Sequence, residues 1–138
     1  MFEMHLFLWG PLWEFAGREA PDILDEEDAA FGFTSDGHYV TVAKARALAA
    51  RLTVLLRRGI VGAESRAHVE RARRERLRVC RACRGRRIVL YRAEPHDFRG
   101  PCAQCDGTGH PRSFPRFRTS WVREFRDFCE GSGGFWIR

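Results

Sequence analysis

Two short motifs in the middle of the chain, Cys80-Arg-Ala-Cys83-Arg-Gly85 and Cys102-Ala-Gln-Cys105-Asp-Gly107-Thr-Gly109, place four of its five cysteines in pairs. The two residues between the cysteines let one tight turn present both sulfur atoms of a pair to a single metal ion. The glycine two positions after each second cysteine permits the positive φ that closes such a turn. The pairs are 18 residues apart, a spacing typical of a tetrahedral site with four thiolates.

The residues between the pairs favour a hairpin that would carry both turns to one metal. Residues 88–91, Ile-Val-Leu-Tyr, are strand-like, and turns are expected near Pro95 and at Gly100-Pro101. Four cysteines fill a tetrahedral shell, whereas a catalytic zinc keeps one position open. We therefore predict one structural zinc ion, bound by Cys80, Cys83, Cys102 and Cys105.

Other ligands and other cysteine chemistry are the alternatives to this site. A redox dithiol opens a helix beside a βαβ sheet, and the sequence around the pairs does not have that pattern. His96 and His110 flank the second motif and could replace a thiolate, and the sequence does not decide whether either contacts the metal. The fifth cysteine, Cys129, is expected to be a small buried side chain on the apolar face of a helix.

The paired motifs resemble the cysteine-rich zinc region of DnaJ-type chaperones, whose repeat is Cys-x-x-Cys-x-Gly-x-Gly. The second motif matches this repeat in full, and the first departs from it at Arg87, which stands where the second glycine would be. That family carries four repeats and two zinc ions, so two repeats imply one zinc, as in anti-TRAP-like proteins, which act by binding another protein. The resemblance covers about thirty residues, and the sequence contains no His-Pro-Asp of a J domain.

Outward from these motifs, the chain is predicted to be α+β. Thr41 can cap a helix over 42–58 that ends at Gly59, because apolar residues recur there at three-four spacing. A largely solvated helix is expected over 63–78, with Val69, Ala72 and Val79 as its only apolar stripe, and a last helix over 121–129, capped by Ser120. The remaining expectations are a short strand or helix in 1–18 packed through Phe7, Trp9, Trp13 and Phe15, an acidic loop over 19–38 with a turn at 35–38, and strands at 38–40 and 135–137.

We expect a body of two or three helices with short strands, built from residues 1–63 and 119–138. Residues 64–118 are expected to be an insertion, a basic helix followed by a zinc-knuckle hairpin arm. Segments 36–50 and 125–137 resemble parts of small bacterial and phage proteins, which implies that the arm is inserted into an existing small α+β body.

Charge is distributed unevenly along the chain, whose net charge is +6. Residues 1–40 carry −8 and residues 66–92 carry +9, which predicts either an internal acid–base contact or two separate charged surfaces. Lys44 is the one lysine among 24 basic residues, and arginine favours forked contacts to carboxylates and phosphates. Candidate contacts to a partner or to nucleic acid are Arg71, Arg73, Arg74, Arg76, Arg84, Arg86, Arg87, Arg112, Phe114, Arg116 and Phe117.

These features favour a small zinc-binding regulatory or adaptor protein, not an enzyme, that binds a protein partner through its arm. The first alternative is a nucleic-acid-binding zinc protein that uses the arginine-rich segment. The second is a thiol-disulfide or zinc enzyme. A cytoplasmic location is expected, since no apolar run approaches the roughly 20 residues of a membrane span and the first ten residues lack a basic leader. The partner, the pathway and the oligomeric state are left open by the sequence.

Overall fold

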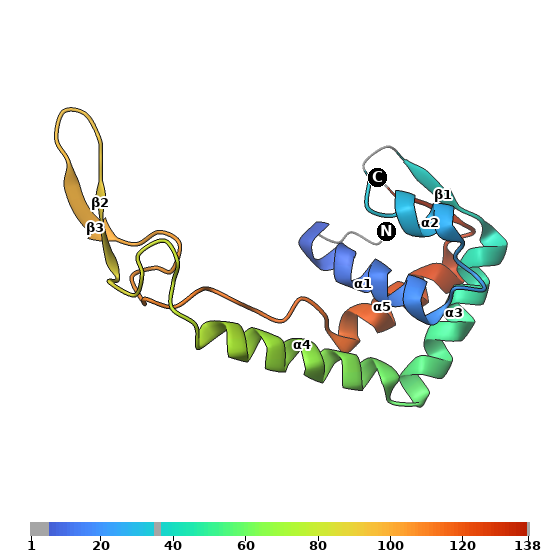
Figure 1. Ribbon diagram of the computed structural model, residues 1–138. Helices are drawn as coiled ribbons and strands as arrows, with labels where there is room; N and C mark the ends of the chain where they lie inside the picture. Colours follow the sequence, from blue (N-terminus) through green and yellow to red (C-terminus); the bar gives the residue numbers. More distant parts are fainter. Residues whose placement is uncertain (1–5, 35–36, 138) are drawn as a thin grey trace. The chain divides into compact units, whose positions relative to one another are not determined.

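The computed structural model describes residues 6–34 and 37–137, which form five helices and four short strands (Figure 1). The strands form two separate two-stranded antiparallel sheets, so the predicted α+β class is confirmed. The chain divides into two compact units, one made of residues up to 66 together with 116–138 and the other of residues 67–115. The sequence places these boundaries at 64 and 118. Among the described residues, no helix is both long and apolar enough to cross a membrane.

The first unit joins the two ends of the chain. It contains α1 (Leu6–Glu19), α2 (Glu26–Phe31), β1 (His38–Val40), α3 (Val42–Arg57), α5 (Thr119–Gly131) and β4 (Phe135–Ile137). Helix α4 (Ile60–Arg76) begins in this unit and continues into the second. Figure 1 shows α5 and β4, in red, beside the blue and cyan N-terminal elements, and β4 pairs with β1 in the register His38↔Ile137.

The core of this unit is aromatic. Trp9 and Trp13 stack with their ring centroids 5.1 Å apart, and Phe125 of α5 meets Trp9 edge-on at 5.3 Å. Both indole N–H groups are satisfied, because Trp9 donates to the carbonyl of Gly32 and Trp13 to the carbonyl of Asp28. Residues 6–19 are therefore helical and pack through Trp9, Trp13 and Phe15 as expected, while the side chain of Phe7 lies outside the described residues.

Helix α3 confirms the clearest prediction from the sequence. The side-chain oxygen of Thr41 accepts a hydrogen bond from the Lys44 amide and caps the first turn, and Gly59 follows the helix with φ +74°. The predicted cap of α5 is wrong, because that helix begins at Thr119 and Ser120 lies inside it. Arg118 stands at the N-cap and makes no side-chain capping bond.

The expected loop over 19–38 is also wrong in part, because α2 interrupts it. Asp25 and Asp28 form a capping box in which each carboxylate accepts from the other's backbone amide, at 2.9 and 3.0 Å. Such reciprocal caps satisfy two amides that a short helix would otherwise leave without partners. The turn predicted at 35–38 includes Ser35 and Asp36, which lie outside the described residues.

The second unit contains the end of α4, two cysteine turns and a hairpin. Strand β2 (Ile88–Tyr91) pairs with β3 (Phe98–Pro101) in the register Ile88↔Pro101 to Tyr91↔Phe98, so the predicted hairpin is confirmed. The turn expected at Gly100-Pro101 is wrong, because both residues lie in β3 and pair with β2. Of the apolar stripe predicted for the second helix, Ala72 is buried and Val69 is exposed. Val79 is exposed too and lies beyond Arg76, where the helix ends.

Candidate metal centre

The two cysteine turns, which we call the first knuckle (residues 80–87) and the second knuckle (residues 102–109), have the same backbone path. Their positive φ angles match position by position: 51° and 51° at Arg84 and Asp106, 76° and 69° at Gly85 and Gly107, and 69° and 84° at Arg87 and Gly109. Arg87 therefore adopts the left-handed conformation that the glycine adopts in the second knuckle. For a residue with a Cβ this conformation costs roughly 1 to 2 kcal/mol.

The knuckles are joined by a reciprocal pair of backbone hydrogen bonds. The amide of Cys80 donates to the carbonyl of Gly109 at 2.8 Å, and the amide of Cys102 donates to the carbonyl of Arg87 at 2.8 Å. Each knuckle thus binds the last residue of the other through the amide of its first cysteine. Because these bonds link segments far apart in sequence, they bring the two pairs of sulfur atoms together.

The four thiols form one compact, buried group. Their residues are between 0% and 3% exposed, and all four Sγ atoms lie within 4.8 Å of one another. Cys83 Sγ and Cys105 Sγ are 3.7 Å apart. Zinc–sulfur bonds of about 2.3 Å in a tetrahedron give a sulfur–sulfur edge of about 3.8 Å, whereas a disulfide would need about 2.05 Å. The group therefore fits one tetrahedrally bound metal ion, and all of its cysteines are free.

The surroundings of two of the thiols, Cys102 and Cys105, shift their pKa values in opposite directions. Burial raises the pKa of Cys102 to about 11. Burial acts in the same direction on Cys105, but the Gly109 amide, which donates to its Sγ at 3.3 Å, and the neighbouring thiols together lower the pKa of Cys105 to about 6. A bound cation would favour the thiolate form at every position, because it offsets the cost of burying negative charge.

Side chains other than the four cysteines stabilise the sulfur group. Val89 of β2 packs against the four cysteines. The hydroxyl of Tyr91 donates to the carbonyl of Pro101 at 2.7 Å and accepts from the amide of Ala103 at 2.9 Å, which ties the hairpin to the second knuckle. Sequence reasoning did not single out Tyr91, because its partners follow about ten residues later and become neighbours only across the hairpin.

The histidines flanking the second knuckle are not part of the sulfur group. His110 is exposed, and its Nδ1 bonds the carbonyl of Arg78 at 2.9 Å. His96 is exposed as well, and neither residue belongs to the one group of potential metal ligands found among the described residues. Cys129 lies in the first unit, where burial raises the pKa of its thiol to about 12.

Most of the predicted contact residues are exposed, with one exception. Arg71, Arg73, Arg74 and Arg76 of α4 are exposed. Arg84, Arg86, Arg87, Arg112, Phe114 and Arg116 are exposed too, and Arg112 pairs with Asp106. Phe117 is 1% exposed, and its ring packs 5.0 Å from that of Phe15. The structure therefore places this ring in the core of the first unit, apart from the exposed residues of the predicted contact set.

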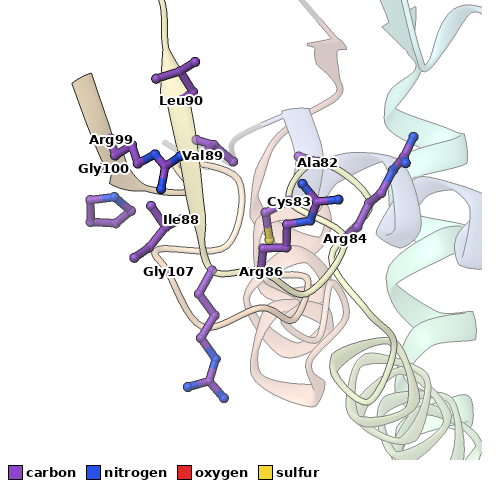
Figure 2. Close-up of a pocket in the computed structure, with 12 residues that line it drawn as sticks. Ala82, Cys83, Arg84, Arg86, Ile88, Val89, Leu90, Arg99, Gly100 and Gly107 are labelled. Carbon is purple, nitrogen blue, oxygen red and sulfur yellow. The ribbon is translucent and has the colours of Figure 1, made fainter. Parts of the chain in front are cut away.

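A groove with a volume of about 870 Å³ lies beside the centre, between the first knuckle and the hairpin. Figure 2 shows Arg84 and Arg86 of the knuckle on one side and Arg99 of β3 near Ile88 and Leu90 on the other. Sequence analysis left Ile88, Leu90 and Arg99 out of the candidate contacts. The alternation of side chains along a strand could have indicated this face, because it places Ile88 and Leu90 on the same side.

Comparisons of the chain with protein-family models, with curated proteins and with solved structures give no significant match. The case for a metal centre therefore rests on the arrangement of these four cysteines.

Proposed function

We propose that this protein binds one structural zinc ion through Cys80, Cys83, Cys102 and Cys105, and that the zinc-stabilised residues 67–115 bind a partner protein. The observation that carries the proposal is the buried group of four sulfur atoms, which all lie within 4.8 Å of one another and of which those of Cys83 and Cys105 are 3.7 Å apart. Four soft thiolates in this geometry suit zinc or iron. Zinc is proposed because a structural Cys₄ zinc site has this ligand set and this Cys-x-x-Cys spacing.

A structural role follows from the closed ligand shell. With four thiolates bound, zinc has no position for an activated water, so we propose no hydrolytic or thiol–disulfide activity for the metal-loaded protein. The matching backbone of the two knuckles supports the resemblance to the DnaJ-type repeat. A cytoplasmic location is part of the proposal, because a reducing compartment keeps such thiols available for metal.

The surface of the second unit supports a protein partner. Among the described residues, seven of the twelve exposed large hydrophobic side chains lie in residues 67–115, namely Val69, Leu77, Val79, Ile88, Leu90, Phe98 and Phe114. This unit is about one third of the chain, so exposed apolar groups are concentrated in it. Such concentration is typical of surfaces that bind other proteins.

Nucleic acid remains the second candidate, and one observation favours it. Residues 67–115 contain 12 arginines and 5 acids, a net charge of +7 before any metal is bound. Four of these arginines lie exposed along α4 at positions 71, 73, 74 and 76, where they could contact a phosphate backbone.

The metal is tested by native mass spectrometry and elemental analysis of the purified protein. One zinc per chain is expected, and it should be lost in Cys102→Ser but kept in Cys129→Ala, the matched control outside the site. Substitution by cobalt should produce the visible spectrum of tetrahedral thiolate coordination. Iron in place of zinc, two metal ions, or a disulfide without metal would overturn the zinc assignment.

Partner binding is tested by affinity purification from the host with metal-loaded, metal-stripped and Cys102→Ser protein. A protein recovered in stoichiometric amount with the metal-loaded form, and lost with the other two, is the expected result. Cys129→Ala should recover the same protein. Recovery that does not depend on the metal would contradict a zinc-stabilised interaction.

A further inference from the structure

The groove beside the metal centre is lined by positive charge without a matching negative charge. Arg84, Arg86 and Arg87 of the first knuckle and Arg99 of β3 reach it, and no acidic residue lines it. Within the described part of the chain, none of these four arginines pairs with a carboxylate. A groove of this kind attracts an anionic group from outside the chain, and guanidinium forks bind carboxylates in a two-point geometry.

Acidic residues of the N-terminal segment are engaged within the first unit. Asp22 pairs with Arg51 at 2.7 Å, and Asp25 pairs with Lys44 at 2.7 Å. Asp28 is buried and also pairs with Lys44. These three carboxylates meet bases of α3, so each is paired within its own unit.

Two of the arginines that line the groove have a left-handed backbone conformation, which is unfavourable for a residue with a Cβ. Arg84 has φ 51° and Arg87 has φ 69°, and the second knuckle places Asp106 and Gly109 at the matching positions. Glycine, and to a lesser degree aspartate or asparagine, adopts this conformation more easily than arginine. Backbone strain of this kind is found at functional sites, where the side chain has a role that offsets it.

The hairpin adds an aliphatic face to the groove. Ile88 is 57% exposed and Leu90 is 55% exposed, and Arg99 lies opposite Leu90 in the ladder. The ring pair Tyr91–Phe98 occupies the alternate positions of the two strands, so it belongs to the other face. Single-stranded nucleic acid is bound by stacking on aromatic rings, and the groove offers branched aliphatic chains instead.

We propose that this groove binds an acidic segment of a partner protein that also carries bulky apolar side chains. Carboxylates of the segment pair with Arg84, Arg86, Arg87 and Arg99, and an apolar side chain packs on Ile88 and Leu90. The inference rests on the proposed protein-binding function and names its surface and the chemistry of its partner. A segment of this kind pairs with the arginines and also packs on Ile88 and Leu90, whereas a purely anionic polymer makes only the first kind of contact.

Fluorescence anisotropy with defined peptides tests the groove on the intact, metal-loaded protein. The probe is a labelled peptide of about twelve residues that combines glutamate with several leucines. One control peptide replaces leucine by serine, another replaces glutamate by lysine, and a single-stranded oligonucleotide of similar charge serves as the competing ligand. We expect saturable binding of the glutamate–leucine peptide alone among the peptides, and weaker binding of the oligonucleotide.

Arg87→Gly is the decisive variant, because glycine adopts the φ of this position and matches Gly109 of the second knuckle. Metal content and thermal stability should be kept, while affinity for the glutamate–leucine peptide should fall roughly tenfold, the effect of losing one charged hydrogen-bonding group. The control Arg92→Gln removes the same charge outside the groove and should change affinity less than twofold.

A second pair of variants tests the apolar contact. Replacing both Ile88 and Leu90 by threonine puts a residue that favours strands at both positions and should abolish the preference for leucine over serine in the peptide. Val69→Thr, an exposed apolar site on α4, is the matched control and should keep that preference.

The outcomes separate this inference from the proposed function. No binding of the glutamate–leucine peptide at low salt, or binding that Arg87→Gly leaves unchanged, would overturn the groove assignment. Tighter, Arg87-dependent binding of the oligonucleotide would assign the groove to nucleic acid instead. If affinity purification still recovers a partner in a metal-dependent way while the groove variants bind it normally, the proposed function stands and this inference falls.

Discussion

Lys44, the one lysine in the chain, donates to the carboxylate of the buried Asp28 with its Nζ 2.5 Å from Oδ2. Asp28 is 1% exposed, and its other carboxylate oxygen lies 2.7 Å from Nε2 of His38. The carbonyl of Asp28 accepts from the indole of Trp13. Through this one residue, α2 is linked to β1, to α3 and to α1. A charge buried this deeply requires its partners.

Removing the partner of Asp28 should destabilise the first unit strongly. Lys44→Met leaves a buried carboxylate without its cation, which should lower the free energy of unfolding by about 3 kcal/mol. Lys44→Arg keeps the charge and should lose less. All four tryptophans, Trp9, Trp13, Trp121 and Trp136, belong to the first unit, so denaturant unfolding followed by tryptophan fluorescence measures the effect there. A loss below about 0.5 kcal/mol in Lys44→Met, the range of ordinary surface changes, would contradict a buried ion pair.

Asp25 should contribute a stability that disappears in acid. The hydrogen bond from Lys44 first, and that from the Asp28 amide second, lower the pKa of Asp25 from 3.8 to about 2. Because the pKa is lower in the folded state, the contribution is fully present above pH 3.8 and is lost as the pH falls through about 2. Asp25→Asn should therefore destabilise the protein at pH 7 and have little effect near pH 2.

The comparison of wild type with Asp25→Asn at each pH cancels changes common to both, including loss of metal in acid. Tryptophan fluorescence again reports the first unit. A difference in stability that persists undiminished at pH 2 would show that Asp25 acts through something other than its charge.

The metal-loaded protein should react slowly with a thiol probe. Metal-bound thiolates share their charge with the ion, and Cys129 is a buried thiol whose pKa burial raises to about 12. Chelation should expose four fast thiols, and Cys129→Ala should leave that number unchanged. Stopped-flow measurement with and without a chelator gives the count. Reduction of insulin by the metal-loaded form would contradict the proposal that it has no thiol–disulfide activity.

The exposed arginines of α4 allow a test of the nucleic-acid alternative. If they contact phosphates, the logarithm of affinity for duplex DNA should fall with the logarithm of salt concentration, with a slope near −0.9 for each phosphate neutralised. Replacing four arginines by glutamine should then flatten that slope. The four are Arg71, Arg73, Arg74 and Arg76.

A control variant with the same change of charge should leave the slope unaltered. It replaces four exposed arginines of the first unit by glutamine, namely Arg46, Arg57, Arg58 and Arg123. Absence of binding to duplex DNA, single-stranded DNA and RNA at low salt would eliminate this alternative. Equal flattening by both variants would indicate attraction by net charge without a site on α4.

Local chemistry explains which elements could be predicted. The side chain of Thr41 meets an amide three residues later, and the apolar stripe of 42–58 repeats with the helix itself, so neither signal depends on distant residues. The cysteine turns are local as well, which is why spacing alone identified the four thiols that the structure brings together. The local pattern was misleading at Ser120, a suitable capping residue that lies two positions after the N-cap Arg118 and therefore inside α5.

Long-range packing decided what the sequence left open. Phe117 follows an arginine and precedes another, so its neighbours favour a surface position, yet Phe15, more than one hundred residues earlier, covers its ring. The local sequence predicts that Gly32 lies in a loop and gives no further reason for a glycine. In the structure, a Cβ at this position would lie 1.7 Å from the indole nitrogen of Trp13. Glycine is required at that position by a tryptophan that only the tertiary fold brings near.

By itself, the sequence determined the elements and cysteine turns that depend on nearby residues: the capped α3, the hairpin and the two knuckles. The tertiary structure alone decided the linkage of Asp28 to Lys44 and His38, and the exchange of amides between the knuckles. It also decided that Ile88 and Leu90 share a groove with four arginines. The physical reason is that a local turn is selected by the side chains within it, whereas a buried charge or a groove depends on segments that meet only after the chain has closed on itself.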